Sequence, residues 1–253
     1  MQIENFDGFF WLLVLLAPLL YLQRSLHREI QGIFLLITRR ADISLALFSL
    51  LFFPGVLLHE LSHFFMSRLL GVPTGRISLL PRTLEDGRLQ LGYVETGRTD
   101  IFRDAMIGMA PLLAGGICVT LTGMRGLGLD GVWAAMVADQ GVAFSQAIRG
   151  VMERPDFWLW FYMTFVISST MLPSASDRRA WLPLLLVLSI LLGIVLLAGA
   201  GPWLVEHLAP AVNSGLRALA AVFGISVGVH ALILVPMWLL RKLISKVTHL
   251  QVV

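Results

Sequence analysis

Charged residues are scarce in this chain of 253 residues. Asp, Glu, Lys and Arg make up 14% of the sequence and hydrophobic residues 57%, whereas an average soluble domain carries about 25% charged residues. So little charge cannot cover the surface of a water-soluble protein of this length, and apolar surface therefore has to face a lipid bilayer. The composition excludes an ordinary soluble domain and predicts an integral membrane protein.

Three other features are lacking. The single cysteine, Cys118, excludes an internal disulfide framework. The net charge is only +3 and the basic residues form no continuous run, so no nucleic-acid partner is expected. No internal repeat or low-complexity tract divides the chain, and we therefore expect a single membrane domain over residues 1–253.

Long apolar segments dominate what is present. With about 20 apolar residues needed per crossing, we predict an all-α polytopic membrane protein with about six transmembrane helices, over residues 9–21, 43–70, 105–122, 157–172, 181–200 and 216–240. Arg241, Lys242 and Lys246 follow the last span and favour cytoplasmic termini, in the cell membrane of a prokaryote. The basic loop after the first span argues against this orientation.

The pattern changes between the second and third predicted helices. Residues 75–80 and 88–95 resemble two short strands, because polar and apolar residues partly alternate in the second of them. The sequence Glu85-Asp86-Gly87 between them is a turn signal. We therefore predict a small β-hairpin directly after the second helix.

The second apolar segment contains the sequence HELSH, from His59 to His63. On a helix, residues four apart share one face, so both imidazoles can bind one metal ion. Glu60 can reach a water on that metal and act as general base of a metal hydrolase. An unpaired ionisable group in a membrane helix costs about 2.5–3.5 kcal/mol, so three within one turn indicate a shared ligand rather than packed residues. We predict one zinc ion per chain.

A catalytic zinc ion takes three protein ligands and keeps one position open. Asp177 follows the fourth predicted helix, and Pro173 breaks that helix and lets the chain fold inward. Alternating helix directions place this end on the same side as HELSH, so we predict Asp177 as the third ligand. Two alternatives stay open: Asp177 pairs with Arg178 or Arg179, or His230 in the last helix binds the metal.

At these residues the sequence resembles the site-2 protease family of intramembrane zinc metalloproteases. That family has HExxH on one transmembrane helix and an aspartate ligand on a later one, places filled here by HELSH and Asp177. The small-residue run from Ala110 to Gly116 is similar to a Gly-Pro segment of the family. The likeness covers about residues 43–181 and implies core catalytic helices there, with the hairpin loop at 71–103.

The resemblance implies hydrolysis of peptide bonds in transmembrane protein substrates. Such a peptide must be extended, and a strand edge can hold it by β-augmentation. The candidate substrate-binding residues are Arg88, Leu89, Gln90, Leu91, Gly92 and Tyr93. The alternative is that the hairpin is a plain surface connector, and the oligomeric state is left open.

One departure from the family pattern concerns the oxyanion. The family often has an asparagine before the aspartate, whereas the asparagines of this chain are Asn5 and Asn213. Ser168, Ser169 or backbone groups are the alternative donors. Because that asparagine is missing, two other functions stay open. One is a zinc-binding regulatory membrane protein without proteolysis, and the other is a zinc or ion transporter with ligands from several helices.

Overall fold

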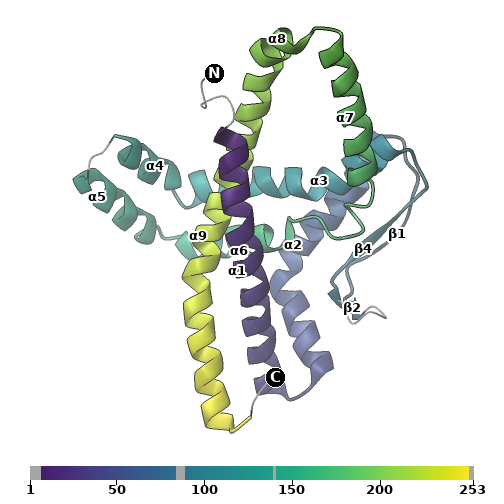
Figure 1. The fold of residues 1–253 in the computed structure, drawn as a ribbon. Helices are drawn as coiled ribbons and strands as arrows, with labels where there is room; N and C mark the ends of the chain where they lie inside the picture. Colours follow the sequence, from purple (N-terminus) through teal and green to yellow (C-terminus); the bar gives the residue numbers. More distant parts are fainter. Residues whose placement is uncertain (1–6, 84–88, 139–140, 251–253) are drawn as a thin grey trace.

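The computed structural model describes residues 7–83, 89–138 and 141–250, and most of them are helical (Figure 1). The longer helices are α1 (Asp7–Thr38), α2 (Ala41–Leu69), α3 (Ile101–Thr120), α6 (Phe157–Thr170), α7 (Trp181–Leu197) and α9 (Ala209–Thr248). The π-helix η2 (Leu121–Gly126) continues α3, and α8 (Gly201–Trp203) with the π-helix η3 (Leu204–Leu208) leads into α9. A side hairpin consists of α4 (Leu129–Val137) and α5 (Gly141–Met152).

Within the described residues, four helical segments are long and apolar enough to cross a membrane: Asp7–Thr38, Ala41–Leu69, Ile101–Gly126 and Gly201–Thr248. They contain the predicted first, third and sixth spans, and they contain the second except for its last residue, since α2 ends at Leu69. The predicted fifth span is the shorter apolar helix α7. The predicted fourth span becomes α6, whose 14 residues reach about 21 Å at 1.5 Å per residue, less than the roughly 30 Å of a bilayer core. Six spans are therefore not confirmed.

Helices α1 and α9 pack side by side and run parallel (Figure 1). The Gly8 N–H donates to Asn213 Oδ1 at 2.9 Å. Arg217 Nε lies 2.7 Å from Asp7 Oδ1, and Arg241 pairs with Glu29 further along both helices. The two ends of the described chain therefore lie at opposite ends of this pair. This arrangement gives no support to the prediction that both termini lie on the cytoplasmic side.

The strands in the described part of the chain form two small antiparallel sheets that extend from the helices. β1 (Thr74–Ser78) pairs with β4 (Tyr93–Thr96), and β2 (Arg82–Thr83) pairs with β3 (Leu89–Gln90). The register places Ser78 opposite Tyr93 and Thr83 opposite Leu89. The predicted hairpin is thus confirmed, although its second strand is interrupted at Leu91 and Gly92. The predicted turn at residues 85–87 lies outside the described residues.

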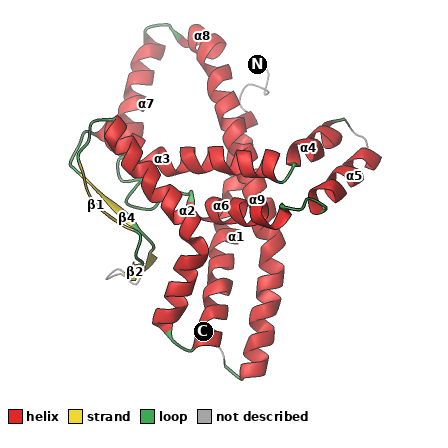
Figure 2. Cartoon of the chain, turned by 180° about the vertical axis from the view of Figure 1, so that it is seen from behind, coloured by secondary structure: helices red, strands yellow, loops and turns green. Residues whose placement is uncertain are grey.

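The core lies where α1, α2, α3, α6 and α9 meet. In both views α3 runs across the direction of α1 and α9 (Figures 1 and 2). The larger side chains of this core are Leu19, Phe48, Phe52, Phe165, Met171 and Phe223. The C-terminal half of α2 and the C-terminal end of α6 both reach α3, and this crossing positions the HELSH segment.

Candidate metal centre

The HELSH segment lies inside α2, as predicted, and both histidine rings are held by backbone carbonyls of other helices. Nδ1 of His59 lies 2.7 Å from the carbonyl oxygen of Thr170 at the end of α6. Nδ1 of His63 lies 2.9 Å from the carbonyl oxygen of Ile107 on α3. A carbonyl oxygen can only accept, so Nδ1 carries the proton in each ring. Each Nε2 therefore has a free lone pair, which is the form that binds a metal.

Asp177 faces these two lone pairs. The two Nε2 atoms are 3.2 Å apart. Nε2 of His59 lies 3.6 Å from Asp177 Oδ2, and Nε2 of His63 lies 3.4 Å from Oδ1. One ligand atom from each residue fits within 4.8 Å of the others. The predicted three residues therefore come together and can hold a metal ion.

Electrostatics at Asp177 also favour a positive charge between the three groups. Burial opposes ionisation of this carboxyl, but the neighbouring His59, His63 and Ser174 outweigh burial and hold its pKa well below the usual range. Because Nδ1 of each ring already donates to a carbonyl, a positive charge on the rings would require an additional proton on an Nε2 atom. A cation at the same point satisfies the three groups without that proton.

The loop after α6 is fixed so that Asp177 points inward. The Ser174 N–H donates to Asp177 Oδ2 at 2.7 Å. Arg179 forms two hydrogen bonds of 2.7 Å with Asp104 on α3, and the Arg178 Nε donates to the Ser174 carbonyl. The predicted alternative, in which Asp177 pairs with one of these arginines, is thus not what the structure shows.

Gly108 allows the same loop to lie directly on α3. A Cβ atom at this position would be 1.9 Å from the carbonyl oxygen of Asp177. Gly55 has a similar role in the turn of α2 that precedes His59, since its Cβ would be 2.4 Å from Thr170 Oγ1. Neither glycine was predicted from the sequence, nor were the carbonyl groups of Ile107 and Thr170, because a backbone group leaves no signature in the sequence.

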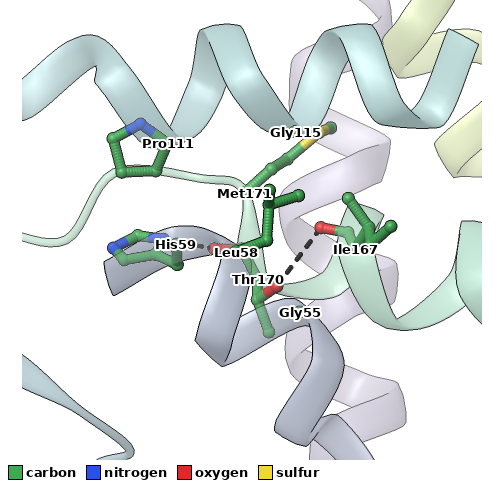
Figure 3. Close-up of a pocket in the computed structure, with 8 residues that line it drawn as sticks. All are labelled: Gly55, Leu58, His59, Pro111, Gly115, Ile167, Thr170 and Met171. Atoms are coloured by element: carbon green, nitrogen blue, oxygen red, sulfur yellow. Dashed lines mark hydrogen bonds between the residues drawn. The ribbon is translucent and has the colours of Figure 1, made fainter. Parts of the chain in front are cut away.

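A narrow pocket adjoins His59 where α2, α3 and α6 meet. Figure 3 shows the His59 ring beside Thr170, with Pro111 and Gly115 of α3 across from it. Both α3 residues belong to the small-residue run 110–116 that the sequence singled out. The remaining lining residues are Gly55, Leu58, Ile167 and Met171. The pocket is therefore apolar apart from His59 and Thr170.

Glu60 is buried, with 6% of its surface exposed. It lies within electrostatic range of His59, His63 and Asp177. The hairpin covers it: a Cβ atom on Gly92 would be 2.9 Å from Glu60 Cγ and 3.0 Å from Oε1. Of the other candidate substrate-binding residues, Leu89 and Gln90 form β3, Leu91 precedes Gly92 and Tyr93 begins β4, while Arg88 lies outside the described residues.

The remaining histidine candidates lie elsewhere. His230, the alternative third ligand, is fully buried in α9 and contacts Ser169 and Ser226. His27 follows the predicted first span and lies within α1, where its ring packs against Phe48 and Phe52. This helix continues without a break past the end of that span. Neither histidine belongs to the cluster.

The candidate oxyanion donors are also accounted for. The Ser168 hydroxyl donates to the Phe165 carbonyl at 3.0 Å, and the Ser169 hydroxyl contacts His230 at 2.9 Å. Asn213 binds residues at the start of α1. The structure thus directs none of these three side chains to the metal cluster.

Comparison of the chain with protein-family models, with curated proteins and with solved structures finds no match.

Proposed function

We propose that this protein is an intramembrane zinc metalloprotease of the site-2 protease type, which hydrolyses peptide bonds of transmembrane protein substrates. One observation carries the proposal: two histidine Nε2 atoms and the Asp177 carboxylate converge, beside a buried glutamate, on a helix apolar enough to cross a membrane. Two imidazoles and one carboxylate are a ligand set of catalytic zinc sites. A structural zinc site has no use for the glutamate.

The separations within the cluster support zinc over larger cations. Tetrahedral coordination at about 2.0–2.1 Å places ligand atoms about 3.3 Å apart. The separations of 3.2, 3.4 and 3.6 Å among the two rings and the carboxylate are close to that distance between ligand atoms. Calcium takes 6–8 oxygen ligands at about 2.3–2.6 Å, and an imidazole pair does not suit it.

Glu60 is the proposed general base. When bound, zinc would polarise the scissile carbonyl and lower the pKa of a water molecule to about 7. The Glu60 carboxylate would accept a proton from that water as the water oxygen bonds to the scissile carbonyl carbon, and would pass the proton to the amide nitrogen as the C–N bond breaks. His59, His63 and Asp177 hold the metal, and the carbonyls of Thr170 and Ile107 fix the rings.

Metal removal tests this function directly. Purified wild-type protein is expected to carry one zinc per chain by elemental analysis and to cleave a membrane-protein substrate in detergent. A chelator should abolish cleavage, and Zn²⁺ but not Ca²⁺ should restore it, because the donor set contains two nitrogens. Absence of zinc from the folded protein, or cleavage that survives chelation, contradicts the proposal.

The hairpin is the proposed substrate platform. Gly92 is buried against Glu60, and each described sheet has only two strands, so its strands leave edges to which an extended peptide can add. A peptide paired with the strand that contains Tyr93 would enter beside the general base. Leu89 and Gln90 form β3, and Leu91 and Gly92 connect β3 to that strand.

Gly92→Ala is expected to lower the cleavage rate by about tenfold to a hundredfold, the effect of a displacement of roughly 1 Å near the reacting groups. The added Cβ would press on Glu60 and on the carbonyl of Ser78, 3.1 Å away. Zinc affinity should stay within about threefold of wild type, since no ligand moves. The matched control is Gly75→Ala, whose Cβ meets the flexible side chain of Glu95. Equal rates for both variants contradict the platform.

A regulatory zinc protein without protease activity is the second candidate. It is favoured by the engagement of Ser168 and Ser169 away from the metal cluster, which leaves no side-chain amide or hydroxyl from these positions for the oxyanion. The measurements of zinc content and cleavage described above distinguish the regulatory protein from the protease. Zinc bound at one per chain, with no membrane protein cut by wild type, supports the regulatory function.

A further inference from the structure

The C-terminal end of α6 is held by side chains of two other helices. The last carbonyl groups of a helix have no partner within it and need donors from outside. Gln23 of α1 donates its Nε2–H to the carbonyl of Ser169 at 2.5 Å. His59 of α2 donates its Nδ1–H to the carbonyl of Thr170 at 2.7 Å. Two consecutive carbonyls thus join α1 to the metal cluster.

A third helix reaches the same point through His230. Its Nδ1 lies 2.7 Å from the Ser226 carbonyl, so Nδ1 carries the proton. Nε2 of the neutral ring then accepts the hydroxyl proton of Ser169 at 2.9 Å. His230 has no exposed surface and Ser169 is 2% exposed. The side chain and the carbonyl of Ser169 are therefore both fixed, from α9 and from α1.

We propose that Gln23, Ser169 and His230 are positioning residues for the metal: they fix the end of α6 so that the Thr170 carbonyl orients the His59 ring. The partner that accepts the second N–H of a metal-binding histidine sets the ring orientation and raises its basicity. Here that partner is a carbonyl next to Ser169 in the chain. The inference rests on the proposed metal site and adds three residues to it.

Stability alone does not require this polar group of residues. Replacing both partners of a buried hydrogen bond with apolar groups of the same shape is often nearly neutral for folding. A buried network that is fully satisfied does, however, restrict the chain to one arrangement. Thr170 needs that restriction, because a rotation of its peptide plane would turn its carbonyl away from His59 Nδ1.

Helix α6 offers a matched control. Thr164 has no exposed surface, and its hydroxyl contacts the Thr122 hydroxyl at 2.9 Å. Thr164→Val and Ser169→Ala each delete one buried hydrogen bond between side chains of α6 and another helix. Only Ser169 lies next to the residue whose carbonyl binds His59. If these residues serve packing alone, both changes should alter zinc affinity equally, whereas a positioning role predicts a larger effect for Ser169→Ala.

The experiment measures zinc affinity by chelator competition, the visible spectrum of the cobalt-substituted protein, and the thermal midpoint of the metal-free protein. Ser169→Ala and Gln23→Met are expected to weaken zinc affinity by about 10–100-fold and to shift the cobalt bands. Thr164→Val should leave affinity within about threefold and the bands unchanged. Adding His230→Leu to Ser169→Ala should produce little further loss, since both remove the same bond.

Equal zinc affinities and cobalt spectra for Ser169→Ala and Thr164→Val would overturn the inference. If Ser169→Ala does not fold, Gln23→Met decides by the same two measurements, because Gln23 is only partly buried. Failure of the underlying function looks different. If wild-type protein binds no zinc, the proposed metal site itself is wrong. If wild-type protein binds zinc but cleaves no membrane protein, the positioning role still holds and only the protease function is contradicted.

Discussion

Replacing Glu60 with glutamine is expected to slow cleavage by about 10²–10⁴-fold, the usual contribution of a general base, while zinc content stays at the wild-type level. The amide keeps the shape of the side chain but cannot accept the proton of a water molecule. Glu60 is no member of the ligand cluster, so the metal should be retained. The measurement compares the membrane proteomes of cells that carry wild type or Glu60→Gln, in which substrates accumulate uncut.

The control for this change is Glu153→Gln, at an exposed position after α5. It alters the charge of the protein by the same amount and should leave cleavage unchanged. If cells with Glu60→Gln cut the same membrane proteins at the wild-type rate, Glu60 is not the base. A loss of zinc along with activity would instead assign Glu60 to the metal site.

Gly108→Ala is expected to weaken zinc binding by about 100-fold or more, above the range for residues that act through a ligand. A Cβ atom 1.9 Å from the Asp177 carbonyl oxygen and 2.9 Å from its carbonyl carbon cannot be accommodated by a side-chain rotation. The loop must move away from α3, and the carboxylate moves with it. Zinc titration of the purified variant measures this loss.

Gly116→Ala on the same helix is the matched control. Its Cβ would meet Val222 at 3.9 Å, which is ordinary contact. Both glycines are buried in α3, and both changes raise helix propensity equally. Wild-type zinc affinity in Gly108→Ala would show that the loop can shift without moving Asp177.

The metal cluster could be predicted from the sequence because its information is local. The four-residue spacing of His59 and His63 fixes one face of a helix, and Pro173 marks where α6 has to end. To predict Asp177 as a ligand, it was then sufficient to infer that this end of α6 lies on the same side of the helices as HELSH. What could not be predicted is the contribution of backbone groups, such as the Ile107 carbonyl on His63, because any residue supplies a carbonyl.

The predicted number of six crossings is not confirmed, for a different reason. The apolar stretch that forms α6 is too short to distinguish a membrane span from a buried helix by composition, and the structure makes it a helix of 14 residues within the core. The length of the first helix was underestimated. Polar residues from Gln23 onward suggested that the helix ends there, whereas α1 continues to Thr38. Packing against other helices satisfies two of these polar groups, because Gln23 donates to the Ser169 carbonyl of α6 and Glu29 pairs with Arg241 of α9.

The parallel pairing of α1 with α9 also sets the order of events during synthesis. Gly8 and Asn213, which bind each other, are 205 positions apart. At about 5–20 residues per second a ribosome needs roughly 10–40 s to make that length of chain. During this interval HELSH and Asp177 are already made, while the surface of α1 that will meet α9 has no partner. His230 arrives last, so the end of α6 can acquire its final support only after the three metal-binding residues have been made.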